Sequence, residues 1–190
     1  GRGEITVLAL AYGLAGFGYI ITATFLPVIA RQSLPGSPWL DMFWPIFGAG
    51  VVAGALVASR IRTRLDLRTL LAVCYAIQAL GIAVGLWSPS LAGFAIGSLP
   101  LGLPFTAITF FAMQEVRRIR PQAPAALMGL VTALYGLGQI VGPPLAAALL
   151  ARASTPAAGF RVSLEIAAGA LVLGGVLFAA MTRLWPARQM

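Results

Sequence analysis

Six long apolar segments, separated by short polar links, constrain the fold of this chain more than any other feature. A helix needs about 20 mainly apolar residues to cross the hydrocarbon core of a bilayer. The segments that meet this length are 5–30, 38–59, 69–87, 91–113, 124–151 and 159–182. Only 9% of the residues are charged, whereas a soluble domain carries roughly 25%. We therefore predict an all-α membrane protein with one six-helix transmembrane bundle over residues 1–190.

The Arg residues are distributed unequally between the links. All 13 basic residues are Arg, and the links after the second and fourth segments, with the two ends of the chain, hold all but three of them. The exceptions are Arg31, Arg152 and Arg161. Basic residues are enriched on the cytoplasmic side of membrane proteins. We therefore predict that both ends of this segment lie in the cytoplasm. The Arg residues do not follow an amphipathic face, which argues against binding of nucleic acid.

Ser or Thr precedes Pro in each of the three links on the Arg-poor side. Such a pair favours the start of a helix, because the hydroxyl accepts a backbone N–H bond and Pro lacks the N–H that would be unpaired there. We expect helices to start at Ser37-Pro38, Ser88-Pro89 and Thr155-Pro156.

Two glycine-rich stretches, 47–54 and 135–142, follow one pattern: aromatic, Gly, any residue, Gly, any residue, Val or Ile, any residue, Gly. They lie in the second and the fifth predicted helices, and because this offset of three helices is odd, the two copies should cross the membrane in opposite directions. This predicts an inverted-topology repeat with units of about 5–87 and 91–182, an arrangement of many secondary transporters. The alternative is chance similarity between glycine-rich membrane helices.

The glycines of both stretches leave room for close approach of a neighbouring helix. Pro143, directly after the second stretch, is expected to kink its helix. Static packing is one role for these residues, and a pliable seam that lets helices rock is another. The candidate hinge and packing residues are Gly48, Gly50, Gly54, Gly136, Gly138, Gly142 and Pro143.

Four stretches of the chain resemble the C-terminal six-helix half of a transporter of the major facilitator superfamily, from a poorly characterised bacterial branch. They are 12–19, 23–27, 113–118 and 135–144. Their order and spacing extend the resemblance along nearly the whole chain. The resemblance implies a place in the bacterial inner membrane, a small-molecule substrate, and an N-terminal six-helix half of the same polypeptide that lies outside this segment. Alone, the segment is expected to be inactive, and a homodimer of halves is the alternative.

Two motifs of that superfamily are matched imperfectly. Residues 54–64 resemble its gating motif, but no acid stands at Ala58 or Ser59, and Asp66 comes later. Residues 138–143 resemble its antiporter motif, with alanines where a closing glycine pair is usual. The candidate cytoplasmic gate loop consists of Arg60, Arg62, Arg64, Asp66 and Arg68.

The resemblance also implies that the first, second, fourth and fifth helices contribute to a central substrate cavity. Polar groups are costly in hydrocarbon and should face such a cavity or another helix. The cavity candidates are Tyr12, Tyr19, Thr22, Thr24, Trp44, Thr109, Thr132, Tyr135 and Gln139. Hydrogen bonding between helices is the alternative for each, and we expect it for Gln78. The scarcity of charge favours a neutral or lipophilic solute.

Asp41 and Glu165 are possible coupling acids on the Arg-poor side. Each has a simpler alternative, because Asp41 near a helix start complements the helix dipole and Glu165 stands four residues after Arg161. Glu115 is expected to form an ion pair at the membrane interface.

Other kinds of six-span protein fit the residue types poorly. The chain has no His to serve as the base of a rhomboid-type protease, and no Asn for the loops of an aquaporin. A single Cys cannot form a metal cluster, so we predict no metal or cofactor and no enzymatic activity. We predict half of a secondary active transporter that works by alternating access. A structural or assembly membrane protein is the alternative.

Overall fold

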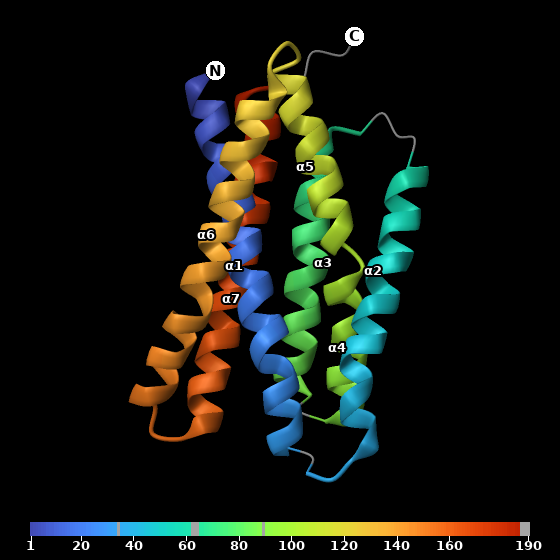
Figure 1. The fold of residues 1–190 in the computed structure, drawn as a ribbon, viewed down its shortest axis with the longest axis vertical. Helices are drawn as coiled ribbons and strands as arrows, with labels where there is room; N and C mark the ends of the chain where they lie inside the picture. The colour runs from blue at the N-terminus through green and yellow to red at the C-terminus, as the bar shows by residue number, and fades with distance from the viewer. Residues whose placement is uncertain (34, 62–64, 89, 187–190) are drawn as a thin grey trace.

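The computed structural model describes residues 1–33, 35–61, 65–88 and 90–186, and the regular elements within these ranges are all helices (Figure 1). In chain order they are α1 (Arg2–Ser33), the 3-10 helix η1 (Pro38–Met42), α2 (Phe43–Arg60), α3 (Leu67–Trp87), α4 (Leu91–Gly102), α5 (Phe105–Ile119), α6 (Pro124–Arg152) and α7 (Pro156–Leu184). The predicted all-α fold is confirmed.

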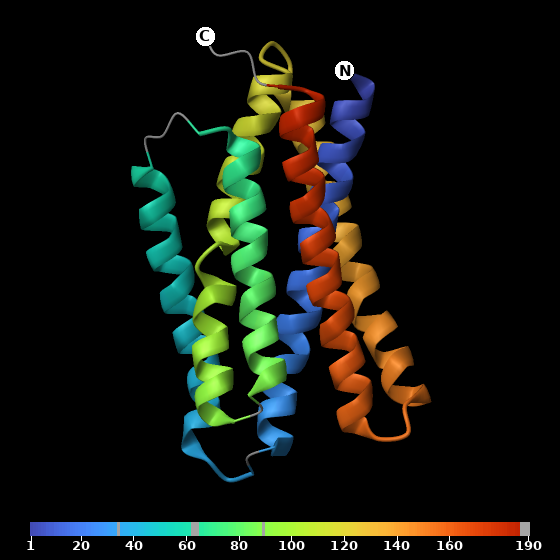
Figure 2. The same ribbon diagram turned by 180° about the vertical axis from the view of Figure 1, so that it is seen from behind.

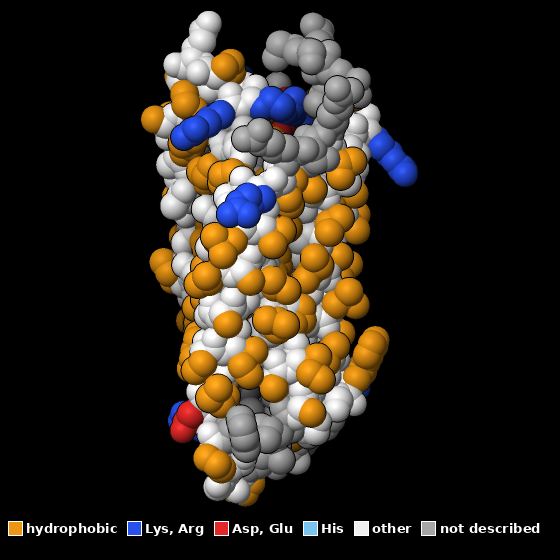
Figure 3. Space-filling view, turned by 90° about the vertical axis from the view of Figure 1, so that its right-hand side faces the viewer, with side chains coloured by type: hydrophobic (Ala, Val, Ile, Leu, Met, Phe, Trp, Pro, Cys, Tyr) orange, Lys and Arg blue, Asp and Glu red, His pale blue; other side chains and the backbone are white. Residues whose placement is uncertain are grey.

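Within the described residues, six helical stretches are long and apolar enough to cross a membrane, with α4 and α5 together supplying the fourth. Successive spans run in opposite directions along the long axis (Figure 1). Large apolar side chains such as Leu10, Leu80 and Ile140 are more than half exposed, and apolar side chains cover much of the surface seen in Figure 3. The chain is therefore a multi-pass membrane protein.

The centre of the bundle is formed by α1, α3 and α7, with α6 on one side and α2 with α4 and α5 on the other (Figures 1 and 2). Tyr75 fixes this centre, because its hydroxyl donates to the Ala11 carbonyl over 2.7 Å and its ring packs edge-on against Phe178. The contacts have a symmetric pattern, in which α1 packs against α6 and α7 while α4 and α5 pack against α2 and α3.

The fourth apolar segment, 91–113, was predicted as one continuous helix. This prediction is wrong, because the helix is interrupted at Leu103 and Pro104. Pro104 has no N–H to donate to the preceding turn, and a second proline, Pro100, lies within α4. The side-chain amide of Gln78 on α3 donates to the Leu101 carbonyl in the last turn of α4 over 3.1 Å. The expectation that Gln78 bonds a neighbouring helix is thereby confirmed.

The helix starts agree only partly with the Ser/Thr-Pro prediction. Thr155 caps α7 as expected, accepting from the Ala158 N–H over 3.2 Å. Ser37 makes no capping bond, and α4 is capped by Ser90 rather than Ser88, while Pro89 lies outside the described residues. The Ser90 hydroxyl accepts from Gly93, which leaves Ser88 at the end of α3.

The two consecutive prolines of α6, Pro143 and Pro144, do not interrupt that helix, which continues to Arg152. Few residues of α6 are buried against the other helices.

Candidate functional site

The helices α1 and α6 approach each other so closely that their backbones touch. A Cβ atom added at Gly138 would overlap the Gly13 carbonyl oxygen and would lie 2.8 Å from the Phe17 nitrogen. One added at Gly16 would overlap the Tyr135 carbonyl oxygen, and one at Gly142 would lie 2.8 Å from Ile20 Cγ2. We call this contact the α1–α6 seam.

A second seam joins α2 to the interrupted span. A Cβ at Gly50 would lie 2.9 Å from the Leu99 carbonyl oxygen, and one at Gly54 would overlap the Leu103 carbonyl oxygen at the helix break. Gly102 is pressed in the same way against the Phe47 carbonyl. In both repeated stretches, the second and third glycines thus lie directly against a neighbouring segment. They contact either its backbone or its apolar side chains.

The first glycine of each stretch behaves differently. A Cβ added at Gly48 or at Gly136 would meet no neighbouring atom within 4 Å. Helix geometry explains the difference, because residues four apart, such as Gly138 and Gly142, share a face, whereas a residue two positions earlier points away.

Three of the predicted cavity residues meet where α1, α5 and α6 come together. The Tyr12 hydroxyl donates to Thr109 Oγ1 over 3.2 Å, and the Tyr12 and Tyr135 ring centroids are 4.9 Å apart. The Tyr12 side chain is buried, but Thr109 is exposed and lines a hollow of about 500 Å³ between α2 and α5. This group combines hydroxyls and aromatic faces with no charged side chain.

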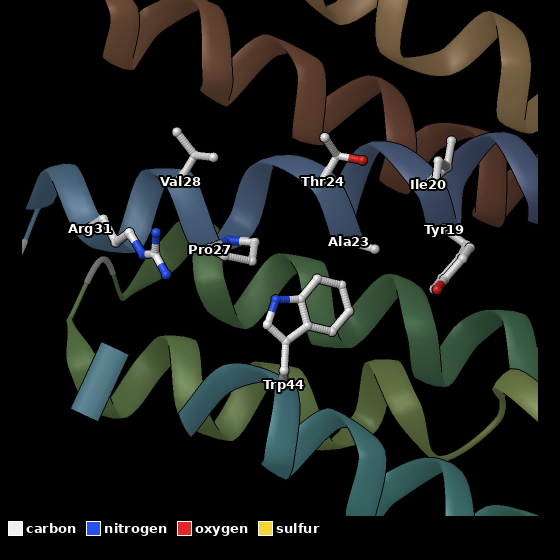
Figure 4. A pocket seen from close by; sticks show the side chains of 8 residues that line it. All are labelled: Tyr19, Ile20, Ala23, Thr24, Pro27, Val28, Arg31 and Trp44. Atoms are coloured by element: carbon white, nitrogen blue, oxygen red, sulfur yellow. The ribbon is translucent and has the colours of Figure 1, made fainter. Parts of the chain in front are cut away.

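A second aromatic group surrounds Tyr19. Its ring centroid is 4.6 Å from that of Phe105 and 6.0 Å from that of Phe47, while Trp44 packs edge-on against Phe47. Tyr19 and Trp44 border an open pocket of about 410 Å³ between α1 and α2 at the end remote from the N-terminus, and Thr24 lines it as well (Figure 4).

The remaining cavity candidates are placed apart from these groups. Thr22 is fully buried, and its hydroxyl donates to the Gly18 carbonyl one turn earlier, so it satisfies its own helix. On α6, Thr132 is exposed and Gln139 is half-buried. No hydrogen bond joins either of these two side chains to another described residue.

At the N-terminal end of the bundle, charged side chains from α1, α3 and α5 form a buried ion-pair cluster: Glu4, Arg68, Glu115 and Arg118. Arg68 is fully buried and bonds the carboxylates of Glu4 and Glu115, the latter over 2.6 Å. It also donates to the carbonyls of Met181 and Trp185 at the end of α7, where the negative end of the helix dipole favours a cation.

Arg118 completes the buried ion-pair cluster from its exposed side. Its guanidinium donates to both carboxylate oxygens of Glu115, over 2.8 and 2.7 Å. Two acids thus face two Arg, and the cluster ties the ends of α1, α3, α5 and α7 together. The expectation that Glu115 forms an ion pair is confirmed.

The residues predicted as a cytoplasmic gate loop are therefore distributed over several environments. Asp66 caps α3 by accepting from the Arg68 N–H over 2.9 Å, Arg60 is exposed at the end of α2, and Arg62 and Arg64 lie outside the described residues. Sequence reasoning missed Glu4. Its signal was a lone acid in the first turn of an apolar span.

The two acids proposed for coupling both lie at the opposite end of the bundle and are exposed. Arg31 contacts Asp41 over 3.2 Å, and Arg161 contacts Glu165 over 2.8 Å at the spacing of one helical turn. These contacts agree with the simpler ion-pair alternative for Glu165.

Alternating apolar spans with glycine seams between them, and a polar aromatic group without charge where α1, α5 and α6 meet, define a multi-pass helical membrane protein. A family model described as "Uncharacterised MFS-type transporter YbfB" matches residues 3–179. The chain belongs to this family of the major facilitator superfamily, as the sequence resemblance predicted. A search of curated proteins finds no match.

Proposed function

We propose that this chain is one six-helix half of a secondary active transporter that moves a small solute across the bacterial inner membrane by alternating access. The observation that carries the proposal is the pair of glycine seams, Gly138 against Gly13 and Gly54 against Leu103, in a member of a transporter family. Flat backbone contacts have few interdigitating side chains, so α6 and α2 can shift against their neighbours at low cost.

The proposed substrate path follows the polar and aromatic groups on α1, α2, α5 and α6. Tyr12, Thr109 and Tyr135 would contact solute at mid-depth, with Gln139 offering an amide that no described residue bonds. A second six-helix half of the same polypeptide would close the cavity, as in the inverted-repeat transporters whose sites lie between halves.

The Arg-rich end, which carries the buried ion-pair cluster, is proposed to face the cytoplasm. There the cluster would hold α1, α3, α5 and α7 as one rigid body, against which α2 and α6 move. Asp41 and Glu165 lie at the outer end and are the proposed coupling acids.

Solute exchange in proteoliposomes tests this function against the alternative of a structural or assembly protein. The intact protein, reconstituted and supplied with labelled small anions, neutral solutes and cations, should show saturable uptake that is accelerated by unlabelled solute inside. Gly138→Leu should abolish exchange, and Gly136→Leu, which enters open space, should retain it. A folded wild-type protein that exchanges no solute of any class would support the structural alternative.

A further inference from the structure

The pocket between α1 and α2 is rich in hydrogen-bond donors, and this composition points to the charge of its ligand. Its α1 wall consists of two adjacent rows at four-residue spacing: Tyr19, Ala23, Pro27 and Arg31 in one, and Ile20, Thr24 and Val28 in the other. Trp44 of α2 stands opposite, on the side of α1 from which Arg31 and Tyr19 extend (Figure 4). From Tyr19 to Arg31 the groove spans about 18 Å of helix.

Among the described residues, the side-chain donors in this pocket are largely unpartnered. No hydrogen bond to another described residue involves the Tyr19 hydroxyl, the Thr24 hydroxyl or the Trp44 indole N–H. The rest of the lining is apolar, and none of the residues that line the pocket is acidic. A ligand that fills it therefore meets an excess of donors together with aromatic and aliphatic surface.

Arg31 is the one charged residue of the lining, and its existing ion pair leaves it available. A single guanidinium nitrogen contacts Asp41 over 3.2 Å, and both side chains are largely exposed. Exposed pairs of this kind are weak, and a guanidinium carries five N–H donors, of which this contact uses one. The free edge can bind a carboxylate through two parallel hydrogen bonds.

The geometry points to an organic anion as the substrate class: a carboxylate bound by Arg31, with an apolar or aromatic body lying along α1 between Tyr19 and Trp44. This inference deepens the proposed function and rests on it, because the bound anion is a substrate only if the protein is a transporter. The scarcity of charge in the whole sequence favoured a neutral solute. We propose an anion in its place, because the charge of the residues that line the pocket determines which ligand binds there.

Binding to the intact protein in nanodiscs of zwitterionic lipid tests the inference with three probes of one shape: phenylacetate, phenylacetamide and phenethylamine. Calorimetry should show phenylacetate binding best, and Trp44 should report it by a change in fluorescence that is lost in Trp44→Phe. Arg31→Gln should weaken phenylacetate at least about tenfold, the effect of roughly one charge-assisted bond, and leave phenylacetamide unchanged. Arg161→Gln, at the same end but outside the pocket, is the matched control.

Equal affinity for the three probes, no binding of phenylacetate, or a preference for the anion that survives Arg31→Gln would overturn the inference. The same chemistry could be offered by the phosphate and acyl chain of a membrane lipid. Loss of phenylacetate binding in nanodiscs with phosphatidylglycerol would assign the pocket to lipid and overturn a soluble substrate. Exchange assays on the same variants test the two proposals separately. Binding of phenylacetate without exchange of any solute would contradict the proposed transport function. Exchange without a preference for anions would contradict the proposed anion site.

Discussion

Alanine at Gly138 and at Gly136 should affect stability in opposite directions, although the two positions are separated by one residue on α6. At Gly138 the new methyl group would overlap the Gly13 carbonyl oxygen and crowd the Phe17 backbone, atoms that cannot rotate away. At Gly136 it would enter open space. Both changes gain the same helix propensity, about 0.5–1 kcal/mol, because alanine replaces glycine within one helix.

The propensity gain cancels when the two variants are compared, so their difference isolates the steric cost of the α1–α6 seam. Overpacking of a tight interior costs about 1–3 kcal/mol, and we expect Gly138→Ala to be less stable than Gly136→Ala by that amount. Denaturation of the purified protein in mixed micelles, followed by circular dichroism against the fraction of SDS, measures the difference. The same comparison on α2, Gly54→Ala against Gly48→Ala, repeats the test in the second seam. Equal stabilities within either pair would refute the assignment of these glycines to close backbone contact.

Three further predictions concern side chains that join helices. Arg68→Ala removes the fully buried guanidinium that bonds both Glu4 and Glu115 and should cost about 3–5 kcal/mol, whereas Arg60→Ala on the exposed end of α2 should cost nothing measurable in the same denaturation assay. Gln78→Met removes the donor to the Leu101 carbonyl and should lower the free energy of unfolding by about 0.6–1.7 kcal/mol. The amides after Pro104 should also exchange hydrogen faster. Exchange as slow as in wild type would show that Gln78 does not stabilise the interrupted helix. Tyr12→Phe keeps the ring contact with Tyr135 and loses only the hydrogen bond to Thr109, so its cost in stability of about 0.5–1.5 kcal/mol should fall well below that of Tyr12→Ala. Similar costs for the two variants would show that the ring contact contributes little.

The membrane spans could be predicted from the sequence because the signal is local: a run of apolar residues long enough to cross hydrocarbon is visible without knowledge of its neighbours. The interruption at Leu103 and Pro104 was missed for the same reason, since residues 91–113 are apolar throughout and hydropathy does not distinguish a broken helix from a straight one. Two prolines four apart, Pro100 and Pro104, were the available signal.

The candidate site was predicted in its residue types and less well in its contacts. Tyr12, Thr109 and Tyr135 were chosen separately as polar groups in hydrocarbon, and their meeting depends on how α1, α5 and α6 pack. Arg68 looked like one of several Arg in a loop, because its burial requires four helix ends to converge. The different roles of Gly136 and Gly138 follow from helical spacing and could have been predicted.

Accessibility measured from both ends of the bundle tests alternating access most directly. Cysteine would replace Thr24 in the pocket between α1 and α2, or Thr109 nearer the Arg-rich end, in a protein freed of other cysteines, including Cys74. The rate of labelling by a water-soluble maleimide would be measured with and without a solute that the protein exchanges. If the protein works by alternating access, the solute changes the two rates in opposite directions. Rates that change together, or do not change while the solute binds, would contradict it.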